Sequence, residues 1–473
     1  MKTKLTTLII ALFSSLWVSA NNITVSNVSL ENYNETENWV NIQCDITWEN
    51  SWRLDSGPSN WDAIWLFAKY RVNGGIWRHV TLDPSQTSTA VNTYTIDVSA
   101  DNKGAFVYRS SAGSGTSLVT NALLGWDLAA NGIDINSTIE VKVFAIEMVY
   151  VPQGSFYLGG SGSETDKFTQ RIISSENEIK DLTYGTTSSY AGDGVTLLPA
   201  AFPKGYNAFY CMKYEISEEQ YVAFFNTLEA DEQPTYDLSA VKNSDGEVDG
   251  NTFSWLGVGT EATTSAPDRA CSYLNYNTLK GYLGWSALRP MTELEYEKAA
   301  RGPYPGVAVA EAYAWGNSLI KNTPYNVTQE GTSDENINGY PGYVYASNYG
   351  SAAYDLTSIN FPRPLRCGIF SFHNISREVS GASYYGIMEL SGNVAELVLS
   401  AGSSYDREYT GGHGAGYTYT YYQFGSSVLA GIRGGGWASD AGLLRIADRT
   451  YGGTLFYAAM YPSLGGRGVR TAN

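Results

Sequence analysis

Cysteine and histidine are the residues of this chain best suited to metal or redox chemistry. The four cysteines are widely spaced with no C-x-x-C pair, and the three histidines form no H-x-x-x-H or H-E-x-x-H pattern. Zinc sites are usually built on such short spacings, so the sequence does not support one. An even cysteine count permits disulfides in an exported protein, but the spacing leaves the pairing open. The residues concerned are Cys44, Cys211, Cys271, Cys367, His79, His373 and His413.

Acidic and basic side chains gather near the end of the chain, where Asp440, Arg445, Asp448 and Arg449 fall within ten residues. Such pairs could exchange protons with a substrate, but in a coil-rich segment they more often stabilise the fold. No G-x-S-x-G, P-loop or dinucleotide motif accompanies them. We therefore expect none of these four residues to be catalytic, and we expect His413, in a glycine-rich loop, to be a surface residue.

The first 20 residues have the features of a secretory signal. Lys2 and Lys4 precede a short apolar stretch, and the segment ends in the small-residue pattern Val18-Ser19-Ala20. The apolar stretch is shorter than the roughly 20 residues that span a bilayer. We expect cleavage near Ala20 and a mature chain that is secreted, periplasmic or at the cell surface, with no transmembrane segment.

The net charge narrows the choice of partners. The chain has 30 basic and 47 acidic residues, a formal charge of −17 at pH 7. Phosphate backbones and anionic lipids attract clustered Lys and Arg. The charge therefore argues against nucleic acid and anionic membranes, and is compatible with cation binding or simply with solubility.

Residues 21–146 are predicted to form a β-sandwich. Residues 40–48 alternate apolar and polar side chains with period two, as in a half-buried strand. Residues 63–72 and 76–80 flank the turn Asn73-Gly74-Gly75 and predict a hairpin. Further strands are expected at 94–98, 105–108 and 139–144. About 120 residues of this pattern are typical of a sandwich domain.

Residues 147–473 lack the strand pattern of the first part, and capping boxes predict two helices there. Ser217 and Gln220 predict one helix start, and Thr292 and Glu295 predict another that ends at Gly302. The rest is rich in Gly, Tyr, Asn and Ser and indicates long ordered loops. The expected fold class is α+β, a β-sandwich followed by a coil-rich domain.

Within the second part, seven segments in order resemble the formylglycine-generating enzyme (sulfatase-modifying factor) family. The segments are MVYVPQGSFYLG (148–159), KYEISEEQYVAFF (213–225), LRPMTELEYEKAARG (288–302), YAWGN (313–317), GIMELSGNVAEL (386–397), RGGGW followed by LRIADR (433–449), and GGR (465–467). The resemblance implies a variant of the C-type lectin fold over 147–473. It does not extend to the predicted sandwich.

The family's enzyme oxidises a substrate cysteine with copper held by two cysteines just after the R-G-G-S-x segment. Here that stretch, 437–444, contains no cysteine. A serine cannot replace a soft thiolate for Cu(I), so we expect no formylglycine generation. Related iron-dependent sulfoxide synthases take three histidines largely from a helical domain that this chain lacks. Copper and iron are thus not expected, and we predict a protein that is not an enzyme.

The resemblance also implies structural calcium near GIMELSGNVAEL. Its ligands would be the side chains of Glu389 and Glu396 and the backbones of Gly392 and Val394. Oxygen donors on a tight turn suit Ca²⁺, although Glu389 replaces the family's shorter Asp or Asn. A second family site would fall near Asn326 and Val327.

Together these features favour a non-catalytic binding or scaffolding module of the cell envelope or extracellular space, with a protein or glycan partner. Relatives in the family serve envelope assemblies such as gliding and type IX secretion. Two alternatives remain open: a metal-dependent oxidoreductase of the formylglycine-generating or non-haem iron type, and a calcium-dependent lectin-like glycan binder. The candidate binding surface consists of Trp437, Ser439, Arg445 and Arg449, with Tyr417, Tyr419, Tyr421 and Tyr422 beside it.

Overall fold

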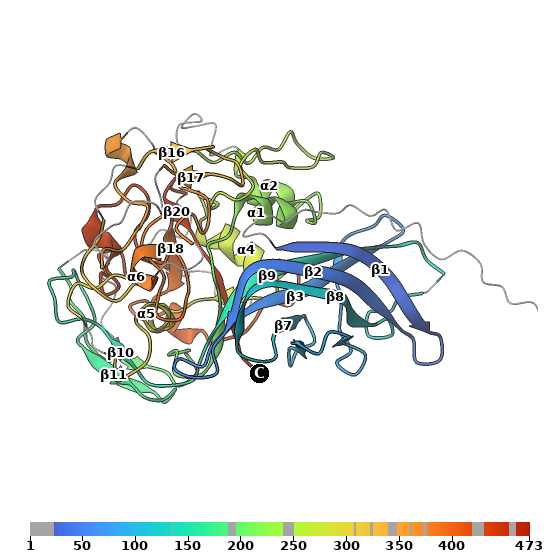
Figure 1. Cartoon of the computed structure of the whole chain (residues 1–473), viewed down its shortest axis with the longest axis horizontal. Coiled ribbons are helices and arrows are strands. Elements are labelled where there is room, and N and C mark those ends of the chain that lie inside the picture. Colours follow the sequence, from blue (N-terminus) through green and yellow to red (C-terminus); the bar gives the residue numbers. More distant parts are fainter. Residues whose placement is uncertain are drawn as a thin grey trace, which may run out of the picture.

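The computed structural model shows strand-rich sheets followed by a coil-rich part with few helices, which confirms the α+β prediction (Figure 1). It describes residues 23–473 except 135, 188–194, 240–249, 307–308, 322–324, 339–347, 360–361, 372–375, 419–429 and 454–459. None of the helices in these ranges is long and apolar enough to cross a membrane.

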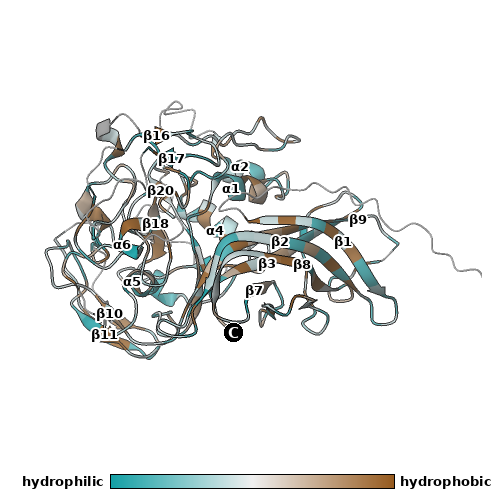
Figure 2. Ribbon diagram, in the orientation of Figure 1, coloured by the Kyte–Doolittle hydropathy of each residue, from teal (hydrophilic) through white to brown (hydrophobic). Residues whose placement is uncertain are grey.

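A four-stranded sheet forms the outer layer of the N-terminal part. Its order is β1 (Thr24–Asn34), β2 (Trp39–Arg53), β8 (Gly113–Asp127) and β5 (Ser88–Thr89). The predicted alternation in β2 is confirmed, since Val40, Ile42, Cys44, Ile46 and Trp48 are all buried. The banding of apolar and polar residues is visible along β1 and β2 (Figure 2).

An eight-stranded sheet forms the central layer and runs through both parts of the chain. Its order is β15 (Arg289–Pro290), β21 (Gly468–Thr471), β14 (Phe209–Met212), β9 (Ile139–Val151), β3 (Asp62–Val72), β7 (Ala105–Arg109) and β6 (Tyr94–Val98), with β4 (Arg78–His79) beside β3. The predicted hairpin is confirmed, because β4 pairs with β3 in antiparallel register.

Strand β9 joins the two parts of the molecule. It pairs with β3 from Ile139 to Val149 and with β14 from Met148 to Val151. The boundary expected between residues 146 and 147 lies inside this strand. The sandwich and the coil-rich part therefore share one hydrogen-bonded sheet.

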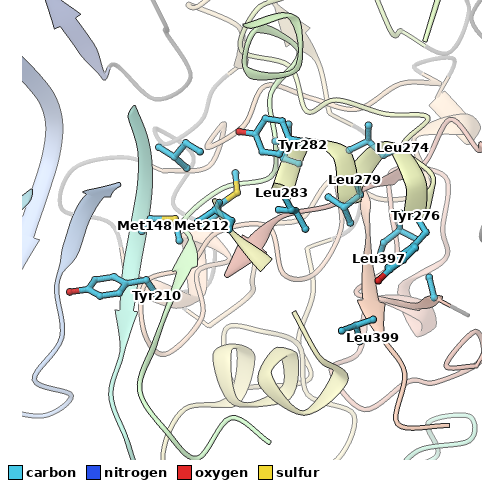
Figure 3. Close-up of a cluster of buried hydrophobic side chains, with 14 of the residues drawn as sticks. Met148, Tyr210, Met212, Leu274, Tyr276, Leu279, Tyr282, Leu283, Leu397 and Leu399 are labelled. Carbon is cyan, nitrogen blue, oxygen red and sulfur yellow. The ribbon is translucent and has the colours of Figure 1, made fainter. Parts of the chain in front are cut away.

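The two faces of the central sheet bury different neighbours. One face packs on the four-stranded sheet, with Ile64 and Val107 in that core. The other face packs on helices α1 (Glu218–Phe225) and α4 (Tyr276–Trp285). Figure 3 shows Met148 and Met212 of the sheet beside Leu283 of α4.

Both predicted capping boxes are present. Gln220 N donates to Ser217 Oγ at the start of α1, and Glu295 N donates to Thr292 Oγ1 at the start of α5 (Glu293–Arg301). Helix α5 ends at Gly302, as expected. The shorter elements of the second part are β10 Phe156–Leu158, β11 Arg171–Ile173, β12 Ile179–Leu182, β13 Val195–Leu198, α2 Gln233–Tyr236, β16 Val327–Thr328, β17 Asn336–Ile337, η2 Leu356–Ile359, α6 Arg377–Ser380, β18 Ala395–Leu399, η3 Asp406–Glu408, β19 Ala430–Arg433, η5 Ala441–Leu444 and β20 Leu464–Gly465.

Three charged side chains are buried where β3, β9 and the end of β14 meet. Lys213 Nζ lies 2.7 Å from Glu147 Oε1, and Asp62 accepts hydrogen bonds from Trp48 Nε1 at 3.2 Å and Trp52 N at 2.8 Å. Burial raises the pKa of Glu147 to about 7; Lys213 opposes this rise and Asp62 adds to it. Lys213 is thus the cation that lets two carboxyl groups share the interior.

We predict that Lys213→Met destabilises the protein by about 3–5 kcal/mol, because it leaves Glu147 and Asp62 buried without a cation. Native Glu147 binds its proton more tightly than the unfolded chain does, so its contribution to stability falls as pH rises from 4.5 to about 7. Removing Lys213 raises this pKa further. The loss should therefore grow with pH in urea unfolding between pH 5 and 8.5.

Lys180→Met is the matched control, since the Lys180 side chain is 72% exposed in its pair with Glu178. It should change the free energy of unfolding by less than about 0.5 kcal/mol. A Lys213→Met protein as stable as the wild type at pH 8 would contradict the role given to Lys213 beside Glu147 and Asp62.

Candidate functional site

A small three-stranded sheet, in the order β19-β18-β20, carries the RGGGW segment. Arg433, at the end of β19, reaches two acidic residues of α5: Nη1 lies 3.2 Å from Glu293 Oε1 and Nη2 lies 2.7 Å from Glu297 Oε1. Arg449 Nε lies 2.9 Å from Glu293 Oε1, and all four side chains are fully buried. The acidic face of α5 therefore fixes this sheet by ion pairs, which is a structural role.

Two residues of the expected binding surface are buried. The Arg449 guanidinium contacts the rings of both Phe168 and Tyr184, 4.1 and 4.2 Å from their centroids. Trp437 is 2% exposed and donates from Nε1 to the Pro462 carbonyl at 2.9 Å. Neither can contact a partner directly, because aromatic and ionic packing inside the domain uses both side chains.

A pocket of about 490 Å³ opens beside the small sheet. Strands β18, β19 and β20 and the 438–448 segment contribute to its walls. The lining residues are Ala395, Ile432, Gly435, Ala438, Ser439, Asp440, Leu443, Asp448, Tyr451, Tyr461, Ser463 and Leu464. The pocket thus lies along the stretch in which the family resemblance would place two cysteines.

Two carboxyl groups supply the charge in this lining. Asp448 is 9% exposed and accepts from Thr450 N at 3.1 Å and Thr165 N at 3.3 Å. Burial raises its pKa above the usual range, against the effect of these bonds and of Arg433. Asp440 accepts from Gly442 N at 2.9 Å and caps η5. No lysine or arginine lines the pocket among the residues that the structure describes.

The other surface candidates have mixed positions. Ser439 lines the pocket, while Arg445 pairs with Glu311 at 3.1 Å and is partly exposed. Tyr417 is 61% exposed. Tyr419, Tyr421 and Tyr422 lie outside the described residues. Of the candidate binding surface Trp437, Ser439, Arg445 and Arg449, only Ser439 and Arg445 are accessible.

All four cysteines lie within the described ranges, and all are free and buried away from the pocket. Burial raises the pKa of Cys44 and of Cys211 to about 12, and it also raises the thiol pKa of Cys271 and Cys367. Metal binding and redox chemistry need the thiolate, which such burial disfavours. These thiols behave as small core residues.

The histidines do not come together. His79 is buried, with Nδ1 2.9 Å from Lys69 Nζ, and His413 Nε2 accepts from Thr471 N at 3.0 Å. His413 is half-buried rather than on the surface, and His373 falls outside the described part of the chain. Within the ranges described, no three His, Cys, Asp or Glu side chains are grouped so as to hold a metal ion.

The segment expected to bind calcium runs into β18, the middle strand of the small sheet, and its two glutamates belong to a buried acidic cluster. Glu396 Oε1 lies 2.5 Å from Arg467 Nε, and Glu389 Oε1 accepts from Gly368 N at 3.0 Å. The second carboxylate oxygen of each has no hydrogen-bond partner in the structure. The expected backbone ligands, Gly392 and Val394, lie on the turn between these two glutamates.

Glu215 is a third member of this cluster that the sequence did not reveal. Its carboxylate accepts from Val394 N at 2.8 Å and from Asn393 Nδ2 at 2.6 Å. Burial, with Glu389 next, raises the pKa of Glu215 well above its usual range. Among the described residues, Arg467 is the one arginine that hydrogen-bonds to any of these three buried carboxyl groups, so the cluster holds excess negative charge or protons.

The second expected metal site falls beside a short pair of strands, β16 and β17. The Asn326 carbonyl accepts from Asn338 N at 2.7 Å, and Val327 pairs with Ile337 in the β16–β17 ladder. These backbone groups serve local pairing. The segments 322–324 and 339–347 beside them lie outside the described residues.

The comparisons with known proteins agree with the arrangement of the second part. The family model of the sulfatase-modifying factor enzyme 1-like domain (FGE-sulfatase) matches residues 138–469. No curated protein matches the chain significantly. The match begins at the start of β9 and covers well over half of the chain. The chain therefore belongs to the FGE-sulfatase family.

Proposed function

We propose that this protein is an exported, non-catalytic member of its family that binds a partner through the pocket beside β18, β19 and β20. One observation carries the proposal. The pocket has the walls of a ligand site, but Ser439, Asp440 and Leu443 occupy the stretch that would have to supply thiolates. Function follows from the residues in a site and not from the fold, and the residues that line this pocket suit binding.

The lining indicates the kind of ligand. Asp440, Asp448 and Ser439 offer hydrogen-bond acceptors, and Tyr451 and Tyr461 offer aromatic surface. Hydroxyl or amine donors next to apolar groups suit such walls. A protein segment or a glycan offers such donors beside apolar groups. The proposed partner is therefore one of these, outside the cytoplasm, in the envelope or the extracellular space.

The oxidoreductase alternative finds less support. Copper would need accessible thiolates, and the four cysteines are buried with raised pKa values. Iron would need a cluster of histidines or carboxylates, and His79 and His413 are each bonded elsewhere. The glycan-binding alternative shares the pocket, so the same experiment separates it from a peptide binder.

We also propose structural calcium at the acidic cluster. The unpartnered oxygens of Glu389 and Glu396 support a cation there, held by two carboxylates and not by a group of three acidic side chains. Carbonyl groups of Gly392 and Val394 would complete the donor set. Glu396 shares its carboxylate with Arg467, so it would contribute one oxygen.

The pocket is tested by filling it. Ala438 is exposed and lines the pocket, so Ala438→Trp should block it without disturbing the core. We expect wild-type protein to enrich defined ligands from a glycan array or a displayed peptide library. Ala438→Trp should weaken the affinity for those ligands at least about tenfold in calorimetry.

Ala200→Trp is the control, because Ala200 lines a separate pocket of about 210 Å³ near Arg289. It should leave the affinity unchanged. Enrichment of no ligand on either array, or equal affinity in the two tryptophan variants, would refute pocket binding. Aldehyde formation on a cysteine-containing peptide, with one copper or iron per chain by elemental analysis, would make the protein an enzyme.

The calcium proposal predicts a pH-dependent stabilisation. Burial raises the pKa of Glu389 to about 7, so calcium must displace protons that the native state holds between pH 4.5 and 7. Without calcium, this group's contribution to stability falls as pH rises through that window. At 100 times its Kd, calcium should add about 2.7 kcal/mol at pH 8 and much less at pH 5.

Thermal unfolding with calcium or with EDTA measures this difference. Glu389→Gln should abolish the calcium effect, whereas Glu31→Gln, on exposed β1, should keep it. If calcium does not change the midpoint of thermal unfolding at pH 8, the calcium proposal is wrong. The buried carboxyl groups are then stabilised by protons and not by a metal ion.

A further inference from the structure

A structured hairpin projects from the coil-rich part after α2. Ser254 and Thr263 exchange both backbone hydrogen bonds, at 2.8 and 2.9 Å, and Thr260 N closes the turn on Gly257 O at 3.1 Å. Trp255 Nε1 donates to the Thr260 carbonyl at 3.2 Å. We call residues 254–263 the apolar hairpin. Its shape is fixed by its own bonds.

The base of the hairpin is anchored to the domain. The Trp255 ring packs edge-on against Phe225 of α1, with centroids 5.2 Å apart. Asn226 Nδ2 donates to the Ala262 carbonyl at 2.9 Å, and Ala262 N donates to Asn226 Oδ1 at 2.7 Å. The tip is therefore held in place before any partner arrives, which reduces the entropy lost on binding.

The tip presents two aliphatic side chains to solvent. Leu256 is 88% exposed and Val258 is 62% exposed, the highest values of any large hydrophobic residue in the described chain. Gly257 and Gly259, at φ 113° and 89°, give the backbone the turn that points both side chains outward. Two neighbouring aliphatic side chains held in water on a fixed turn form a small apolar patch that is available to a partner.

The same chain carries a groove of matching character, which we call the aromatic groove. It has a volume of about 250 Å³ and lies between the end of β2 and the segment 377–386. Trp52, Leu54, Tyr384 and Tyr385 provide its apolar walls. Leu54 is 46% exposed and Tyr384 is 37% exposed, so the groove is open to a ligand.

The hairpin and the groove each carry one charge, and the two charges are opposite in sign. Glu261, which also interacts with Lys142 of β9, is the one charged residue between 250 and 265, and Arg377 is the one charged residue among the described residues that line the groove. The Arg377 guanidinium carbon lies 5.6 Å from the centroid of the Tyr384 ring, at the groove wall. Opposite charges beside an apolar contact orient the two surfaces. A lipid surface fits less well, because the hairpin has no Lys or Arg and the chain carries a charge of −17.

The hairpin and the groove lie in different regions of the molecule. Figure 1 shows α1, which anchors the hairpin, well apart from α6, which borders the groove. A contact between them thus joins two molecules through unlike surfaces. We propose that Leu256 and Val258 of one copy insert into the aromatic groove of a second copy, giving head-to-tail assembly of this chain. This inference does not depend on the ligand of the pocket beside β18.

Sedimentation velocity of the chain without residues 1–20 tests the proposal by complementation. Wild-type protein should form species that grow beyond dimers as its concentration rises. A hairpin variant, Leu256→Asp with Val258→Asp, and a groove variant, Leu54→Asp with Tyr384→Ala, should each associate roughly 100-fold more weakly. A mixture of the two should regain one contact and stop at a 1:1 dimer. Leu118→Asp, at an exposed position of β8, should associate like the wild type.

Cross-linking checks the contact itself. Since all four native cysteines are buried, Leu256→Cys in one chain and Leu54→Cys in another should form a mixed cross-linked dimer with a short bis-maleimide. Wild-type protein that stays monomeric, variants that associate normally, or a mixture that remains monomeric would each overturn the proposal. Far-UV circular dichroism and the unfolding midpoint establish that every variant is folded.

Discussion

Strand β9 is hydrogen-bonded along both of its edges, and the rest of the structure depends on this. Its first eleven residues complete the sandwich by pairing with β3, and its last four residues begin the second part by pairing with β14. Each face of the resulting sheet then has to be covered. The four-stranded sheet covers one face of the N-terminal strands, and helices α1 and α4 cover the other. The coil-rich part can contain long loops because this sheet gives it a rigid base.

Buried arginine–carboxylate contacts hold the coil-rich part together. Arg433 and Arg449 converge on Glu293, and Arg467 reaches Glu396. Buried ion pairs contribute specificity more readily than net stability, since each charge has to lose its water. Here they fix the small sheet against α5 and so shape one wall of the pocket. The motifs of the family resemblance are thus mainly a charged framework around the site.

The parts of the fold that follow from neighbouring residues could be predicted from the sequence. The alternation in β2 and the capping boxes of α1 and α5 each depend on contacts within a few residues. The contacts of Glu215 with Asn393 and Val394 join positions almost 180 residues apart, and no local pattern records them. Trp437 shows the same limit, because nothing in a coil-rich segment distinguishes a buried aromatic residue from an exposed one. The family resemblance drew attention to the stretch 437–444, while the pocket beside it and its carboxyl lining needed the structure.

The shared sheet also determines how the molecule responds to mechanical load. A force that pulls the sandwich away from the coil-rich part acts along β9, parallel to the strand and perpendicular to its hydrogen bonds. The eleven register positions between β3 and β9 then bear the load together rather than one after another. Such shear geometry resists extension far better than the unzipping of a hairpin. The continuous sheet therefore makes the two parts one load-bearing unit, where a flexible linker would leave each to move separately.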